Sequence, residues 1–91
     1  MNAIVEENKV KFSVKVAYNG VPREIEVKTE ERIEHVLKAA IAAFGNPPNP
    51  HTLALFTTDG RELADAQTVE EAGLKPGQEL ILRTSTVKGG Q

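Results

Sequence analysis

The 91-residue sequence predicts an α+β domain with the element order ββαββ and a short helical turn before the last strand. Three observations lead to this prediction: an apolar and polar alternation beside an Asn-Gly pair, an amphipathic stripe at 33–44, and two aliphatic segments at 53–56 and 79–83. Because the helix stripe and the inward strand residues need burial together, we expect the helix to cover one face of the sheet.

Residues 10–16 alternate strictly between apolar and polar side chains, as in a half-buried strand. Asn19-Gly20 follows, and this pair favours a type I′ turn because both central positions need a positive φ. A two-residue loop pairs residues whose numbers sum to 39, so Val14 faces Ile25. Apolar partners then share one face of a tight hairpin and polar partners share the other.

The helix is predicted to begin at Thr29, whose hydroxyl offers an N-cap oxygen. Glu30 and Glu31 add negative charge near the positive end of the helix dipole. The apolar stripe consists of Ile33, Val36, Leu37, Ala40, Ile41 and Phe44. Gly45 and the proline-rich segment 46–50 end the helix, because proline lacks an N–H donor and restricts the residue before it.

Segment 53–56 predicts the next strand, which leads into a turn at Asp59-Gly60. Leu63 is expected to return as a very short strand. The strand residues expected to face the helix are Val10, Phe12, Val14, Val16, Ile25, Val27, Leu53, Leu55, Leu63, Leu80 and Leu82.

Residues 68–71 match the capping-box pattern before one short helical turn, with Leu74 as its core anchor. Pro76-Gly77 fits the central positions of a type II turn, and 79–83 forms the final strand. We expect the folded domain to span 9–84. The flanking segments, 1–8 and 85–91, carry no apolar periodicity and are predicted to be a flexible N-terminus and a mobile tail.

Composition excludes several function classes. The chain has no cysteine, which rules out disulfides, thiolate metal sites and a cysteine nucleophile. A formal net charge of -2 indicates no nucleic-acid binding. No apolar stretch approaches a membrane span and no signal peptide is visible, so we expect a cytoplasmic monomer without membrane association.

Titratable residues do not form a catalytic or metal pattern. His35 and His51 are the only histidines and lie on different elements, so no metal and no cofactor is predicted. Asp65, Glu70 and Glu71 are assigned to turns and capping, because no nucleophile accompanies them. The chain is therefore not expected to be an enzyme.

The element order and its loops resemble ubiquitin and the ubiquitin-like β-grasp family from Val10 to Gly90. The local similarities are the helix start at 33–36, the double-proline loop at 45–48, the short helical turn at 68–74, the last strand at 80–83 and the diglycine end at Gly89-Gly90.

The resemblance implies a protein modifier. An activating enzyme (E1-like) would adenylate the Gly90 carboxylate with ATP and pass it to a cysteine. The acyl group would then reach a protein target, with or without a conjugating enzyme (E2-like). Gly89 and Gly90 suit a narrow channel because glycine lacks Cβ. Gln91 occupies the place of the free carboxylate, so we expect a precursor that a peptidase cuts after Gly90. Lys88 is expected to stay unpacked and to guide the tail toward acidic groups of the activating enzyme.

A partner-binding patch is expected on the sheet face opposite the helix, where the family docks partners. Its residues are Phe56, Ile81 and Arg83, with Phe56 as an exposed aromatic anchor. Ubiquitin has a longer first loop that adds an apolar residue to this patch. Because Asn19-Gly20 forms a tight turn here, we do not expect ubiquitin's own receptors to bind.

Two other functions remain open on the sequence. The first is a sulfur carrier, which shares the β-grasp and diglycine end but bears a C-terminal thiocarboxylate. The second is a non-covalent interaction domain that binds through the patch around Phe56. The resemblance also leaves open whether the pathway is eukaryotic or one of the bacterial systems that resemble ubiquitination.

Overall fold

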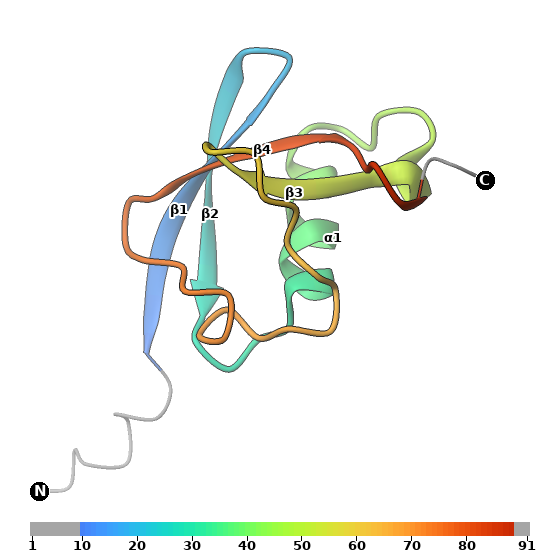
Figure 1. Cartoon of the computed structure of the whole chain (residues 1–91). Coiled ribbons are helices and arrows are strands. Elements are labelled where there is room, and N and C mark those ends of the chain that lie inside the picture. Colours follow the sequence, from blue (N-terminus) through green and yellow to red (C-terminus); the bar gives the residue numbers. More distant parts are fainter. Residues whose placement is uncertain (1–9, 89–91) are drawn as a thin grey trace, which may run out of the picture.

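The computed structural model describes residues 10–88, in which one helix lies against a four-stranded sheet (Figure 1). The elements in chain order are β1 (Lys11–Tyr18), β2 (Val21–Lys28), α1 (Ile33–Ala43), the 3₁₀ turn η2 (Pro50–Thr52), β3 (Leu53–Thr57) and β4 (Glu79–Thr84). The strand order across the sheet is β2-β1-β4-β3. β1 and β4 are parallel neighbours, and the two outer pairs are antiparallel. This arrangement confirms the predicted α+β, ubiquitin-like β-grasp fold.

The first hairpin has the predicted register, with Val14 opposite Ile25. Asn19 has a φ of 52° and Gly20 a φ of 82°, as a type I′ turn requires. The prediction is wrong at Val10, which precedes β1 and is 47% exposed instead of facing the helix.

The helix begins later than predicted. Arg32 is its N-cap and makes no side-chain cap hydrogen bond. The backbone before it pairs with the segment ahead of β4 instead: Val69 donates its N–H to the Glu31 carbonyl at 2.8 Å, and Glu70 donates to the Thr29 carbonyl at 3.0 Å. These long-range bonds hold Thr29 outside the helix, so it cannot act as the N-cap. The predicted end is confirmed, with Phe44 as C-cap and Gly45 at a φ of 79°.

The core lies between α1 and one face of the sheet. The predicted inward residues are buried there, apart from Val10 and the partly buried Phe12. The buried members of the cluster are Val14, Val16, Ile25, Val27, Ile33, Val36, Leu37, Ala40, Ile41, Leu53, Leu55, Leu63, Val69, Ala72, Leu74, Leu80 and Leu82. No helix within residues 10–88 is long and apolar enough to cross a membrane.

The turns before β4 follow their sequence signals. Thr68 and Glu71 form the predicted capping box, in which the Thr68 hydroxyl accepts the Glu71 N–H at 3.0 Å and Glu71 accepts the Thr68 N–H at 2.9 Å. Gln78 donates to the Lys75 carbonyl across a turn in which Gly77 has a φ of 77°. Leu63 is buried, but the chain there makes only an isolated bridge and not a strand.

Candidate functional site

The predicted conjugation and processing residues, Gly89, Gly90 and Gln91, lie outside the described residues. The structure does describe the segment 85–88 that leads to them. This segment was predicted to belong to a mobile tail. In the structure, side-chain and backbone bonds attach Ser85, Thr86 and Lys88 to the rest of the domain, whereas Val87 bonds only to Ser85 within the segment.

Ser85 begins this attachment directly after β4. It is 4% exposed, and its N–H donates to the Thr52 carbonyl at 2.8 Å. Its hydroxyl donates to Glu62 Oε2 at 2.5 Å and accepts the N–H groups of Val87 and Lys88 at 2.9 and 2.8 Å. The Ser85 side chain therefore closes a turn over residues 85–88.

Glu62 is the centre of the attachment. Its Oε1 atom accepts the Thr86 N–H at 3.2 Å and the Thr86 hydroxyl at 3.0 Å, while Oε2 accepts from Ser85. Desolvation by burial acts to raise the pKa of Glu62. The hydrogen bonds from Ser85 and Thr86, with the positive charge of Lys88, lower the pKa by more than desolvation raises it, so the net pKa lies below its usual value. The bonds thus favour the charged carboxylate.

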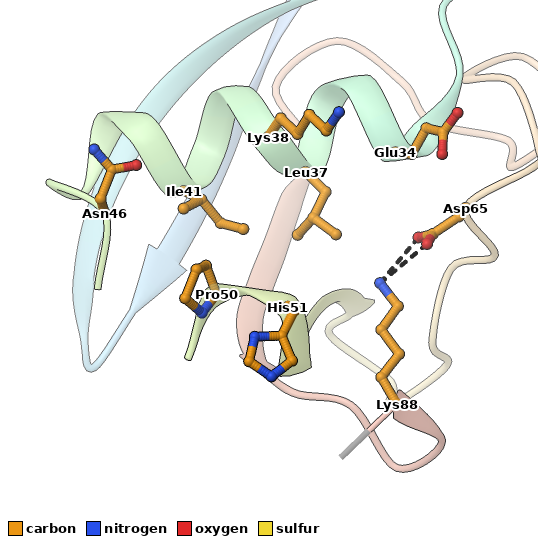
Figure 2. A pocket seen from close by; sticks show the side chains of 9 residues that line it. All are labelled: Glu34, Leu37, Lys38, Ile41, Asn46, Pro50, His51, Asp65 and Lys88. Atoms are coloured by element: carbon orange, nitrogen blue, oxygen red, sulfur yellow. Dashed lines mark hydrogen bonds and ion pairs between the residues drawn. The ribbon is translucent and has the colours of Figure 1, made fainter. Parts of the chain in front are cut away.

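Lys88 makes the last contacts. Its Nζ lies 3.1 Å from both carboxylate oxygens of Asp65 (Figure 2). The same Nζ donates to the Leu53 carbonyl at 3.2 Å. Its side chain is 26% exposed. The expectation that Lys88 stays unpacked is therefore wrong, whereas its role in guiding the tail toward an activating enzyme stays a prediction. We call Glu62, Asp65 and segment 85–88 the clasp.

A cavity of about 580 Å³ adjoins the clasp. Leu37 and Ile41 enter it from α1, Pro50 and His51 come from η2, and the Asp65–Lys88 pair closes one end (Figure 2). Lys88, the last residue that the structure describes, thus lies at the rim of this cavity. Within residues 10–88, no group of three or more His, Asp or Glu side chains is placed to hold a metal ion.

The predicted partner-binding patch differs from expectation at its anchor. Phe56 lies outside the core cluster between α1 and the sheet, yet it is only 1% exposed. The Arg83 guanidinium covers its ring, with Cζ 3.8 Å from the ring centroid. Ile81 pairs with Phe56 across β3 and β4 and is half-buried, while Arg83 is exposed. The Phe56 ring is therefore packed beneath Arg83 and is not exposed on this face of the sheet.

Sequence reasoning missed Glu62 and Ser85, and it assigned Asp65 only to a turn. Glu62 and Asp65 lie on the connection between β3 and β4 and Ser85 follows β4, so the contacts join positions 23 residues apart. The sequence did contain a signal that Arg83 covers Phe56. Arg83 lies two residues beyond Ile81, the strand partner of Phe56, and a long side chain reaches such a diagonal neighbour.

The family described as Protein of Unknown function (DUF2604) matches residues 7–90. The chain belongs to the DUF2604 family. No curated protein matches this DUF2604 chain.

Solved structures place the DUF2604 chain among ubiquitin-like proteins. The ubiquitin of Caldiarchaeum subterraneum is 30% identical, with a TM-score of 0.71 over 86% of this chain and 98% of that chain. A designed protein based on ubiquitin is 28% identical, with a TM-score of 0.73 over 89% and 96% of the two chains. A chain in a complex of pParkin, pUb and UbcH7 is 22% identical, with a TM-score of 0.69 over 82% of this chain and 23% of that chain, which shows the fold alone.

Proposed function

We propose that this DUF2604 protein is a ubiquitin-like modifier, joined to protein targets through the carboxyl group of Gly90. The observation that carries the proposal is the position of Gly89-Gly90, which begins five residues after the end of β4. The chain also has the ubiquitin-like fold and is 30% identical in sequence to the ubiquitin of Caldiarchaeum subterraneum. A Gly-Gly pair alone is a weak motif. Its position after the last strand of a β-grasp domain makes it a candidate conjugation site.

The proposed chemistry has four steps. A peptidase hydrolyses the Gly90–Gln91 bond and leaves a Gly90 carboxylate. That carboxylate attacks the α-phosphorus of ATP and forms an acyl adenylate with release of pyrophosphate. A cysteine thiolate of the activating enzyme displaces AMP and forms a thioester. A target amine finally displaces the thiol and forms an amide bond.

The chain acts as a substrate in these steps and not as an enzyme. The partners are an activating enzyme (E1-like), a conjugating enzyme (E2-like) where the pathway has one, a processing peptidase and the target proteins. Ile81 and Arg83 form the surface proposed to contact these partners, with Phe56 beneath them. The similarity to a chain in a multiprotein complex supports protein partners in general. We place the monomeric modifier in the cytoplasm, where ATP drives the activation.

The test uses the chain ending at Gly90, its cognate activating enzyme and ATP. The expected product is an adduct with the enzyme that a thiol reagent releases and that deletion of Gly90 abolishes. An adduct that survives the Gly90 deletion would refute the proposal. A thiocarboxylate at Gly90, seen as the exchange of one oxygen for sulfur by mass spectrometry, would indicate a sulfur carrier instead.

A further inference from the structure

We propose that the clasp is a latch that keeps Gly90 close to the domain and must open before the activating enzyme can use it. This inference rests on the proposed function. The latch consists of the Glu62 bonds to Ser85 and Thr86. It also includes the Asp65 bond to Lys88, which Figure 2 shows.

The clasp limits how far the tail can reach. With the clasp closed, only Gly89 separates Lys88 from Gly90, so Gly90 lies no farther than about 7 Å from Lys88 even in a fully extended chain. When the clasp opens, the free segment extends from Ser85 to Gly90 and spans up to about 20 Å. A carboxylate that must enter a narrow enzyme channel needs the longer reach.

The contacts of the clasp are mainly polar. Polar bonds hold it, and its apolar member, Val87, is 73% exposed. Opening therefore uncovers little apolar surface. It also breaks no strand pairing, because β4 ends at Thr84 and the clasp segment begins at Ser85. A segment held in this way can open locally while the core stays folded.

Two carboxylates hold the two ends of the clasp segment. Ser85 both donates to Glu62 and accepts two backbone N–H groups, so loss of the Glu62 bond frees the turn that carries Lys88. Asp65 holds the far end of the same segment at Lys88. Neutralising either carboxylate weakens its charge-assisted bonds and should shift the segment toward the open form.

The first experiment requires no partner enzyme. Trypsin cleaves after Lys88 only when that segment fits its active site, so the rate of this cleavage, followed by intact mass, reports clasp opening. Glu62→Gln leaves Lys88 and Asp65 unchanged and should accelerate the cleavage roughly tenfold. Asp65→Asn should accelerate it as well. Glu70→Gln, at an exposed position in the turn before β4, is the matched control and should cleave at the wild-type rate.

Amide exchange provides an independent measurement on the unaltered chain. In a closed clasp, the Lys88 and Val87 amides donate to the Ser85 hydroxyl and should exchange more slowly than a free amide. Exchange at the rate of an unstructured peptide in the wild-type chain would overturn the latch. Equal trypsin rates in the wild type and Glu62→Gln would overturn it as well.

The second experiment measures adduct formation with the activating enzyme, using chains that end at Gly90. Glu62→Gln and Asp65→Asn should form the thioester faster than wild type and Glu70→Gln. Equal or slower rates in the two clasp variants would overturn the latch while leaving the modifier proposal standing. Absence of an adduct in every chain, wild type included, would reject the modifier proposal, and the trypsin rates would still decide whether the clasp opens.

Discussion

Replacing Phe56 by alanine should destabilise the domain, and this change tests the account of the sheet face opposite α1. An exposed anchor at this position would have little effect on folding. In the structure the ring is 1% exposed and lies beneath the Arg83 guanidinium. The side chain therefore contributes to the free energy of folding before any partner is present.

The expected magnitude follows from this burial. Truncation of a buried phenylalanine to alanine costs about 3–5 kcal/mol, and the loss is smaller where the surroundings can close over the space. Because a flexible arginine forms one wall here, we expect the lower end, about 3 kcal/mol. Arg83→Lys removes only the stacked guanidinium and should cost about 0.5–1 kcal/mol.

Urea denaturation followed by circular dichroism measures both changes. With a urea dependence of about 1–1.5 kcal/mol per molar for a domain of this size, Phe56→Ala should lower the midpoint by about 2–3 M. Arg83→Lys should lower it by less than about 1 M. If Phe56→Ala lowers the free energy of unfolding by less than about 1 kcal/mol, the ring is not packed in this way, and Phe56 is an exposed anchor instead.

Three further predictions concern stability. The wild type should be more stable than Glu62→Gln, and this difference should be complete above the ordinary carboxyl pKa of 4.5. It should vanish as the pH falls through the lower pKa of Glu62 in the folded state, because the carboxylate is then protonated. Urea midpoints measured between pH 7 and 3 test this, and a difference that does not change with pH would contradict it. Gly20→Ala should cost about 1–2 kcal/mol in thermal unfolding, because φ is 82° and the space around it is open, leaving backbone strain as the only penalty. Thr68→Ala should cost about 1 kcal/mol and Thr68→Ser much less, and equal losses would argue against the capping box.

The sequence predicted those parts of the fold whose signals are local and redundant. In the first hairpin, the Asn19-Gly20 turn and the matching of Val14 with Ile25 specify one register independently, and the structure has it. The helix end and the capping box at Thr68 likewise depend on residues adjacent in sequence.

The errors arise where distant segments compete with local signals. Thr29 has the chemistry of an N-cap, but its carbonyl accepts the N–H of Glu70, and this pairing delays the helix. The segment after β4 has no apolar residue in a regular pattern, so the sequence indicates a free tail. In the structure it contacts Glu62 and Asp65, which lie on the connection between β3 and β4, far from this segment in sequence. The direct role of Gly90 lies beyond the described residues and stays a prediction.

The central claim is that the Gly90 carboxyl becomes joined to a lysine of another protein. Because Lys88 precedes Gly89-Gly90, trypsin digestion of a denatured conjugate leaves a Gly-Gly remnant on the modified lysine. We predict that conjugates purified through an affinity tag on this chain contain target peptides with that remnant, and that the chain lacking Gly90 yields none. Recovery of the tagged chain with no remnant on any target, and with either an intact Gly90–Gln91 bond or a Gly90 thiocarboxylate, would contradict the claim.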